Sequence, residues 1–348
     1  MQATSSIPIR NIYYMLAYAY QSLSFSEYKN IVNEKFDNTM DLYSEILLIG
    51  LPVLIRGGLL KDYIRINDRT TVIRGKIDIN SSIKQNALVD KKLIVIYDEF
   101  SEDILLNQLL KATLVYLSKN CKLLKEKRRS FFSYLAYFGN VSDIELELKL
   151  WTKVQYNRQN IRYQFLVDIC RFLYEELLIL EDGNVEHQSL YDKQRLSSLY
   201  EKFVYAFYKR ETHYNVVHPQ ILWKVENGFT DALPIMQTDI VLQHKNRTLI
   251  IDTKFYAENM VKRFEGGVAK QKSANLYQIF TYVNNWVHRA NEVVSGMLLY
   301  AMTTAEEQPN HHYEINGNSI SVVTLNLDQE FDAIHNDLIT MVATVLTE

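Results

Sequence analysis

The pattern of apolar and polar residues is most informative over residues 236–256, MQTDIVLQHKNRTLIIDTKFY. Two apolar runs, Ile240–Leu242 and Leu249–Ile251, flank the polar segment His244–Arg247. Short β-forming runs on either side of a polar tip are typical of a hairpin. The rest of the chain is organised around this predicted hairpin.

Apolar residues at helical or strand-like spacing predict a mixture of helices and strands elsewhere. Helices are expected at Ile7–Leu23, Tyr43–Leu60 (interrupted by Pro52 and Gly57–Gly58), Asp103–Leu117, Arg158–Leu180, Leu196–Tyr208, Ser273–Val283 and Asp332–Leu346. Strands are expected within Asp62–Asn80, with a hairpin tip at Asn67–Arg69, and at Lys92–Tyr97, Val216–Val225, Ser295–Met302 and Ser319–Leu327.

The length of 348 residues exceeds that of one ordinary domain, so two domains are expected. The hydrophobic fraction of 47% supports large cores, and only 5 prolines and 11 glycines leave little material for disordered linkers. We predict a mixed α/β (α+β) protein. An N-terminal mixed domain is placed at residues 1–145 and a second domain at residues 146–348.

Charge and cysteine content narrow the functional classes. The net charge of −3 gives no global signature of nucleic-acid binding, so any DNA contact must come from local basic residues or from a partner. Cys121 and Cys170 lie far apart, which indicates neither a zinc site nor a disulfide framework and fits a reducing cytoplasm. The N-terminus lacks the layout of a signal peptide, and no apolar run is long enough to span a bilayer. We therefore expect a soluble cytoplasmic protein.

The candidate chemistry lies at the end of the predicted hairpin. Side chains alternate along a strand, so Asp252 and Lys254 point to one face, and Asp239 can close on that face from the partner strand. Carboxylates hold Mg²⁺, which activates water and neutralises charge on a phosphate, and a neighbouring lysine can orient the water. The alternative is a strand that simply ends in a surface Asp and Lys, and Asp-x-Lys is frequent enough that this pattern alone favours the alternative.

The surrounding sequence favours the chemical interpretation because it resembles the PD-(D/E)xK nucleases. The matching residues are Thr238–Asp239, with Thr238 in place of the family's proline, and Asp252–Thr253–Lys254. The predicted helix that follows carries Gln278 and Tyr282, which resemble the Gln-xxx-Tyr element of nucleases that work with motor proteins. Glu201, on a predicted upstream helix, stands where the family often places another acid.

The resemblance extends to the N-terminal half. Ile7–Leu16 (IPIRNIYYML), Arg74–Asp78 (RGKID) and Asn107–Lys111 (NQLLK) are similar to the McrC family, the nuclease subunits of McrBC restriction systems for modified cytosine. The resemblance implies a Mg²⁺-dependent endonuclease that acts on DNA containing 5-methylcytosine. It also implies that the chain stimulates an AAA+ GTPase partner, McrB, which is expected to be a hexamer. The chain has no P-loop of its own, so GTP would be bound by that partner.

The resemblance also implies roles for individual residues. Asp239 and Asp252 would bind the metal, Lys254 would align water, and Glu201 and Gln278 would assist. Candidates for DNA contact are Tyr282, Lys262, Arg263, Lys270 and Lys272, although an ordinary surface loop would also explain the bases. Candidates for contact with the partner are Arg56, Arg65, Arg69 and Arg74, although a solvated strand face would also explain them.

A second function remains open from the sequence. The chain could be a non-catalytic regulatory adaptor that activates a partner NTPase and retains the nuclease core as a relic. A degenerate site usually loses its lysine or one acid, whereas Asp239, Asp252 and Lys254 are all present here. Their retention favours an active enzyme.

Overall fold

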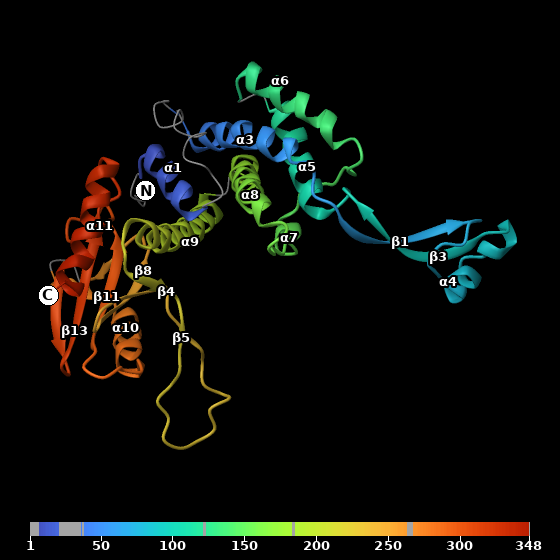
Figure 1. The fold of residues 1–348 in the computed structure, drawn as a ribbon. Helices are drawn as coiled ribbons and strands as arrows, with labels where there is room; N and C mark the ends of the chain where they lie inside the picture. The colour runs from blue at the N-terminus through green and yellow to red at the C-terminus, as the bar shows by residue number, and fades with distance from the viewer. Residues whose placement is uncertain are drawn as a thin grey trace. The chain divides into compact units, whose positions relative to one another are not determined.

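The computed structural model describes residues 7–20, 36, 38–120, 123–182, 185–262 and 267–347. They belong to two compact units, one formed by Met1–Phe25 with Asn184–Glu348 and the other by Ser26–Gly183 (Figure 1). Both units contain helices and strands, so the predicted mixed α/β class is confirmed. In the part of the chain that is described, no helix combines the length and apolar character needed to cross a membrane.

The first unit is built on a six-stranded sheet in the order β12-β13-β11-β8-β7-β4. Strands β8, β11 and β13 run parallel, whereas the β8–β7, β7–β4 and β13–β12 pairs are antiparallel. Their bounds are β4 Asn215–Val217, β7 Ile240–His244, β8 Arg247–Lys254, β11 Val293–Ala301, β12 His311–Ile315 and β13 Asn318–Leu325. The predicted central hairpin is therefore confirmed as β7–β8, and β8 lies inside the sheet.

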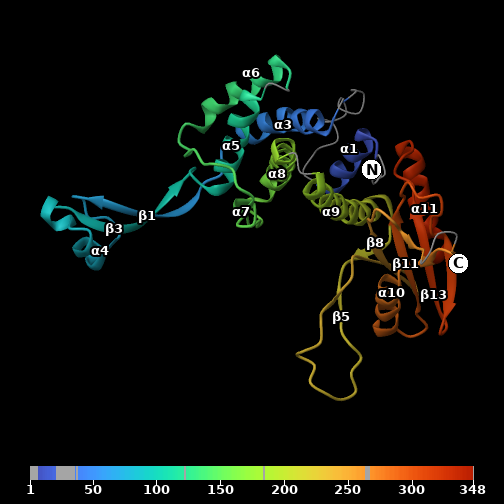
Figure 2. The same ribbon diagram turned by 180° about the vertical axis from the view of Figure 1, so that it is seen from behind.

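Helix α10 (Ser273–Asn285) covers one face of this sheet (Figure 2). Its residues Ile279 and Val283 share a fully buried core cluster with Ile250 of β8. The helix approaches most closely at Gly296 of β11, where an added Cβ would lie 2.8 Å from Ile279. A larger residue would push the helix away, because the core is already packed at contact distance.

The opposite face is covered by α9 (Val185–Glu211) and α11 (Phe331–Leu346), which both contact β8. Leu249 and Ile251 alternate with Ile250 along β8 and point to this face, where both are fully buried. Strand β8 is thus buried on both sides. This burial explains why its sequence is a continuous apolar run without alternation.

The N-terminal helix α1 (Ile9–Ala19) is part of the first unit although it begins the chain. It packs against α9, and Asn11 donates from Nδ2 to the backbone carbonyls of Leu327 and Gln329, each at 2.8 Å. Asn11 is 1% exposed, so these bonds satisfy a buried amide nitrogen that would be costly to leave without a partner.

The compact units therefore do not divide at the predicted boundary between residues 145 and 146. Helix α8 (Ile161–Asp182) belongs to the second unit, because it packs against α3 (Thr39–Arg56) and α5 (Leu105–Lys119). The division falls instead at residues 183–184, and α1 joins the C-terminal unit through contacts far apart in sequence.

The second unit consists of helices and an extended strand ribbon. Besides α3, α5 and α8, its helices are α6 (Lys125–Tyr134), the 3-10 turn η3 (Leu135–Phe138) and α7 (Leu148–Trp151). The predicted interruption of α3 at Pro52 is wrong, because the helix continues to Arg56. Leu51 and Leu54 are buried on either side of the proline, and their packing outweighs the loss of one backbone hydrogen bond.

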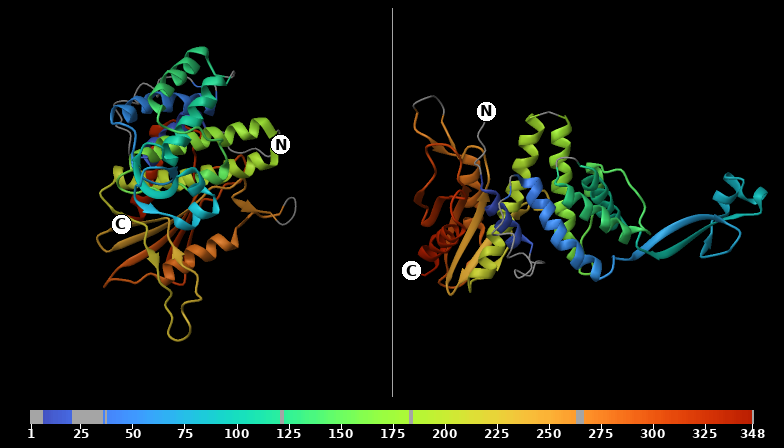
Figure 3. Two further views of the ribbon diagram at one scale, coloured as in Figure 1. Left: turned by 90° about the vertical axis from the view of Figure 1, so that its right-hand side faces the viewer. Right: turned by 90° about the horizontal axis from the view of Figure 1, so that it is seen from above.

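The ribbon pairs β1 (Asp62–Thr70) with β3 (Leu93–Ser101) over nine antiparallel residues and extends away from the helices of its unit (Figure 3, right). The hairpin tip predicted at Asn67–Arg69 is wrong, because β1 continues through it. The segment between the two long strands holds β2 (Lys76–Ile77), α4 (Ile79–Lys84) and the 3-10 turn η2 (Ala87–Asp90). Full-length pairing with β3 satisfies more backbone groups than a tight turn would.

Candidate active site

The hairpin β7–β8 brings the predicted acids together at one end of the sheet. Ile240 pairs with Ile251, so continuing the antiparallel register by one residue sets Asp239 opposite Asp252. Thr238 fixes the backbone just before Asp239, because its Oγ1 donates a hydrogen bond to the carbonyl of Pro219 at 2.8 Å. The two acids, 13 positions apart in the chain, therefore meet because the turn at the far end of the hairpin is tight.

Asp252 is the most buried charged group of the site. It is 1% exposed, and the Lys254 ammonium forms an ion pair with its Oδ2 at 2.6 Å. Burial raises the pKa of Asp252 to about 6; the positive charge of Lys254 opposes this shift, and the negative charge of Asp239 adds to it. Apart from that ion pair, neither carboxylate oxygen has a hydrogen-bonding partner among the described residues. The carboxylate is thus held in the protein with most of its coordinating capacity unused.

Asp239 is anchored by the backbone and side chain of β8. Its Oδ2 accepts hydrogen bonds from the Thr253 amide and the Thr253 hydroxyl, each at 2.8 Å. Side-chain alternation by itself predicts only that Thr253 points away from Asp252 and Lys254. Its role as the anchor of Asp239 was missed because it depends on the path of the chain before β7.

Lys254 is fixed by a chain of polar contacts that ends on the segment before Asp239. Its Nζ donates to Gln278 Oε1 at 3.1 Å, and Gln278 Nε2 donates to the hydroxyl of Tyr282 at 2.8 Å. Tyr282 in turn donates to the carbonyl of Gln237 at 3.0 Å. The predicted pairing of Gln278 and Tyr282 on one helix face is therefore confirmed as geometry, and both residues lie beside the acid–lysine pair.

Glu201 also lies in the electrostatic field of these groups. It is on α9, which contacts β8 from the face opposite α10. Partial burial raises the pKa of Glu201, the charge of Asp239 raises it further, and the charges of Lys202 and Lys254 lower it. The side chain nevertheless keeps an exposed surface, so it can exchange protons with solvent.

The residues present fit a hard divalent cation, although they do not form a complete cage. Among the described residues, no group of three or more His, Cys, Asp or Glu side chains is placed to hold a metal. Apart from the ion pair with Lys254, the two oxygens of Asp252 lack hydrogen-bonding partners among the described residues, and Asp239 uses only Oδ2 in the bonds to Thr253. Mg²⁺ commonly binds through one or two carboxylates and retains several waters, so this donor set suits it.

The predicted DNA contacts are dispersed around the site. Lys262, on the segment after β9 (Met260–Val261), forms an ion pair with Glu307 at 2.8 Å. Lys270 lies on β10 (Lys270–Gln271), and Lys272 is the residue that precedes α10. Arg263 lies outside the described residues. Of these predicted contacts, Lys272 and Tyr282 belong to or adjoin α10, the helix whose Gln278 contacts Lys254.

The predicted partner contacts all lie in the second unit. Arg65 and Arg69 are exposed on β1, Arg74 follows that strand, and Arg56 ends α3. Arg69 forms an ion pair with Asp90. The structure therefore concentrates three of the four arginines on the ribbon.

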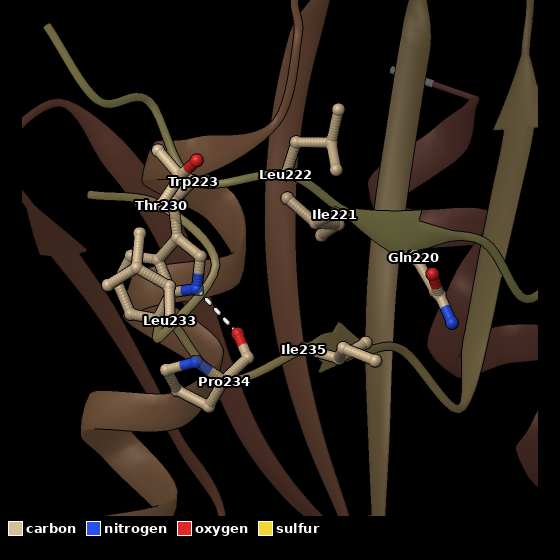
Figure 4. Close-up of a pocket in the computed structure, with 8 residues that line it drawn as sticks. All are labelled: Gln220, Ile221, Leu222, Trp223, Thr230, Leu233, Pro234 and Ile235. Atoms are coloured by element: carbon tan, nitrogen blue, oxygen red, sulfur yellow. Dashed lines mark hydrogen bonds between the residues drawn. The ribbon is translucent and has the colours of Figure 1, made fainter. Parts of the chain in front are cut away.

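One surface feature was not found from the sequence. The loop between β5 (Gln220–Ile221) and β6 (Met236–Gln237) carries exposed Leu222, Phe229 and Ile235. Trp223 donates from Nε1 to the carbonyl of Pro234 at 2.7 Å across a pocket of about 360 Å³ (Figure 4). None of the predicted site residues lines this pocket, so it is separate from the acid–lysine chemistry. The apolar residues of this loop have no regular spacing, so the sequence predicts only a strand at Val216–Val225 and no further element before β6.

Comparisons with known proteins point to one family. The family model of the McrBC 5-methylcytosine restriction system component matches residues 4–301. The type IV methyl-directed restriction enzyme EcoKMcrBC of Escherichia coli K12 is 31% identical over 347 residues, spanning 96% of both chains.

A solved structure gives a matching fold. It is described as a refined half-complex from a tetradecameric assembly of Thermococcus gammatolerans McrB AAA+ hexamers with bound McrC. The TM-score is 0.50 at 14% identity, with 98% of this chain and 77% of that chain covered. At that identity the likeness concerns the fold alone.

Proposed function

The chain belongs to the family of McrBC 5-methylcytosine restriction system components, and we propose that it is the Mg²⁺-dependent DNA endonuclease of such a system. Its fold around β7, β8 and α10 is compatible with the PD-(D/E)xK nucleases. The observation that carries the proposal is the Asp252 carboxylate, which is 1% exposed, paired with Lys254 and otherwise without hydrogen bonds among the described residues. A buried charge of this kind costs stability, and a binding role explains its retention.

In this mechanism Asp239 and Asp252 would hold the metal. When bound, Mg²⁺ lowers the pKa of a coordinated water and neutralises charge on the scissile phosphate. Thr253 keeps Asp239 in place through two hydrogen bonds of 2.8 Å, so that this carboxylate needs no reorganisation before it binds.

Lys254 orients the attacking water and stabilises the negative charge that develops on the phosphate. Gln278 accepts a hydrogen bond from its Nζ at 3.1 Å and restricts the position of that nitrogen. Glu201, whose pKa is raised by partial burial and by Asp239, accepts the proton that the water releases. Lys262, Lys270 and Lys272 contact DNA phosphates in this proposal.

The partner in this proposal is an AAA+ GTPase of the McrB type, which binds GTP and reads modified cytosine. The exposed arginines of the second unit, Arg56, Arg65, Arg69 and Arg74, are the proposed contacts that stimulate it. Guanidinium groups suit this role because they form paired hydrogen bonds with carboxylates and phosphates. The ribbon presents Arg65, Arg69 and Arg74 away from the buried core of its unit.

The test combines the purified chain with its GTPase partner, GTP, Mg²⁺ and a duplex containing 5-methylcytosine. We expect DNA cleavage by wild type and a loss of about 10²-fold or more in the variants Asp239→Ala and Lys254→Ala. GTP hydrolysis by the partner should still rise when either variant is added. Lys245→Ala, which removes a lysine at the other end of the same hairpin, is the matched control and should cleave normally.

The same measurement distinguishes the nuclease from the alternative function, a non-catalytic adaptor that activates its partner. If wild type stimulates GTP hydrolysis but yields no cleavage under any metal condition, the nuclease assignment fails and the adaptor remains. Near-normal cleavage by both Asp239→Ala and Lys254→Ala would show instead that the cutting site lies elsewhere.

A further inference from the structure

A second lysine lies beside the acid–lysine site without a carboxylate partner. Lys272 precedes α10, and its Nζ sits 4.0 Å from the centroid of the Tyr256 ring. Tyr256 comes two residues after Lys254, where the chain leaves β8. Lys272 forms no ion pair with any residue that the structure describes, in contrast to Lys254 and Lys262.

The ring under this lysine is held by a buried amide. Asn275 is 6% exposed, and its Oδ1 accepts a hydrogen bond from the Tyr256 hydroxyl at 3.3 Å. Its Nδ2 donates to the hydroxyl of Tyr300 at 2.8 Å. Both ends of the amide are therefore used, which fixes Tyr256 relative to the helix and to β11.

This network is joined to the catalytic strand by the sheet register. Tyr300 is fully buried and pairs with Lys254 in the parallel alignment of β11 and β8. Lys254 and Tyr300 both contact α10, through Gln278 and Asn275 respectively, so they lie on the same face of the sheet. The position of Lys272 is thus set by the same elements that set Lys254.

The ammonium of Lys272 is partly buried without a neutralising anion in contact among the described residues. Burial lowers its pKa, and only the more distant charge of Glu258 opposes that shift. A tyrosine face attracts an ammonium electrostatically, but it accepts no hydrogen bond of the strength that an anionic oxygen accepts. The ring occupies one side of the ammonium and leaves its other donors available.

We propose that Lys272, supported by the Tyr256 ring, binds a DNA backbone phosphate close to the scissile one, and that Asn275 is the positioning residue for this subsite. The proposal rests on the proposed nuclease function and names how the same site holds its substrate. Lys272 precedes Gln278 by six residues, which corresponds to about 9 Å along the helix. With a rise of about 3.4 Å per nucleotide, the bound phosphate lies roughly one to three nucleotides from the scissile bond.

The measurement is the salt dependence of DNA binding by the complete complex with its GTPase partner. A fluorescein-labelled duplex containing 5-methylcytosine and a non-hydrolysable GTP analogue are the probes. Lys272→Gln should weaken binding roughly 5- to 10-fold at 150 mM salt and reduce the slope of log K against log salt by about 1.

Further variants separate a phosphate contact from a structural role. Lys272→Arg should restore the salt slope, because the cation is retained. Tyr256→Leu should resemble Lys272→Gln, whereas Tyr256→Phe keeps the ring and should show a smaller loss. Asn275→Ala should weaken binding as Tyr256→Phe does, since both break the hydroxyl–amide contact.

Lys209→Gln is the matched control, because Lys209 also lies over a tyrosine ring, at 5.5 Å from Tyr205, on the last turn of α9. Its salt slope should equal that of wild type. An unchanged slope in Lys272→Gln, with wild type cutting DNA, overturns the subsite and leaves the nuclease standing. A reduced slope without cleavage by wild type supports the subsite and overturns the nuclease, and no DNA binding by wild type overturns both.

Discussion

Two antiparallel strand pairs of this protein, β7–β8 and β1–β3, use similar local structure in opposite ways. Strand β8 is buried along most of its length, and the charges at its end have fixed partners: Asp252 pairs with Lys254, and Lys254 also donates to Gln278. Strand β1 is largely exposed, and Arg65 and Arg74 on this ribbon take part in no ion pair with a described residue. Buried charge with fixed partners suits chemistry, whereas exposed charge on an extended ribbon suits association.

The largest effect expected from this contrast is at Asp252. Asp252→Ala should reduce DNA cleavage by about 10³-fold, because it removes the most buried candidate metal ligand. Stimulation of GTP hydrolysis should remain within about 2-fold of wild type. Cleavage and phosphate release measured on one sample check both statements, and a loss of stimulation equal to the loss of cleavage would contradict the separation of roles.

The burial of Asp252 also predicts a pH-dependent cost in stability without metal. Its folded pKa, about 6, lies above the ordinary value of 3.8, so the folded chain binds the proton more tightly than the unfolded chain. Stability from this group is therefore greatest below pH 3.8 and is lost as the pH rises to about 6. The shift corresponds to at most about 3 kcal/mol.

Denaturant unfolding in EDTA measures that cost. Between pH 4 and pH 6.5 the free energy of unfolding of wild type should fall relative to that of Asp252→Asn, which cannot titrate. A constant difference between the two proteins over that range would show that the carboxylate is better solvated than its burial indicates.

Substitutions on the ribbon should affect DNA cleavage only by weakening the stimulation of the partner GTPase. Charge reversal at Arg65, Arg69 and Arg74 should lower stimulated GTP hydrolysis by roughly 10-fold, and cleavage should fall with it. Reversal of Lys153 and Arg158, exposed residues of the same unit outside the ribbon, is the control. If the ribbon variant stimulates as wild type does, the arginines are only a solvated strand face.

The smallest effect is expected at the end of the polar chain from Lys254. Tyr282→Phe removes the hydroxyl that accepts from Gln278 and donates to the Gln237 carbonyl. Cleavage should fall only about 3- to 10-fold, because Lys254 keeps its ion pair with Asp252 and only its orientation loosens. A loss as large as that of Asp252→Ala would indicate that the hydroxyl itself takes part in the reaction.

Local pattern was enough to predict the elements that surround the candidate site. The β7–β8 hairpin and helix α10 follow from short apolar runs, turn residues and helical spacing, which depend on neighbours within a few residues. The pairing of Gln278 with Tyr282 follows from the four-residue spacing alone. The roles of these residues remained a matter of resemblance.

Tertiary structure alone decided the features that depend on contacts between distant parts of the chain. Sequence could not show that α1 joins the C-terminal unit through Asn11, or that β1 passes its expected tip to pair with β3. Nor could it show that Thr253 anchors Asp239 and that Asn275 links Tyr256 to Tyr300. Such contacts depend on the burial and hydrogen bonding of the whole fold, and the local spacing of apolar residues does not predict them.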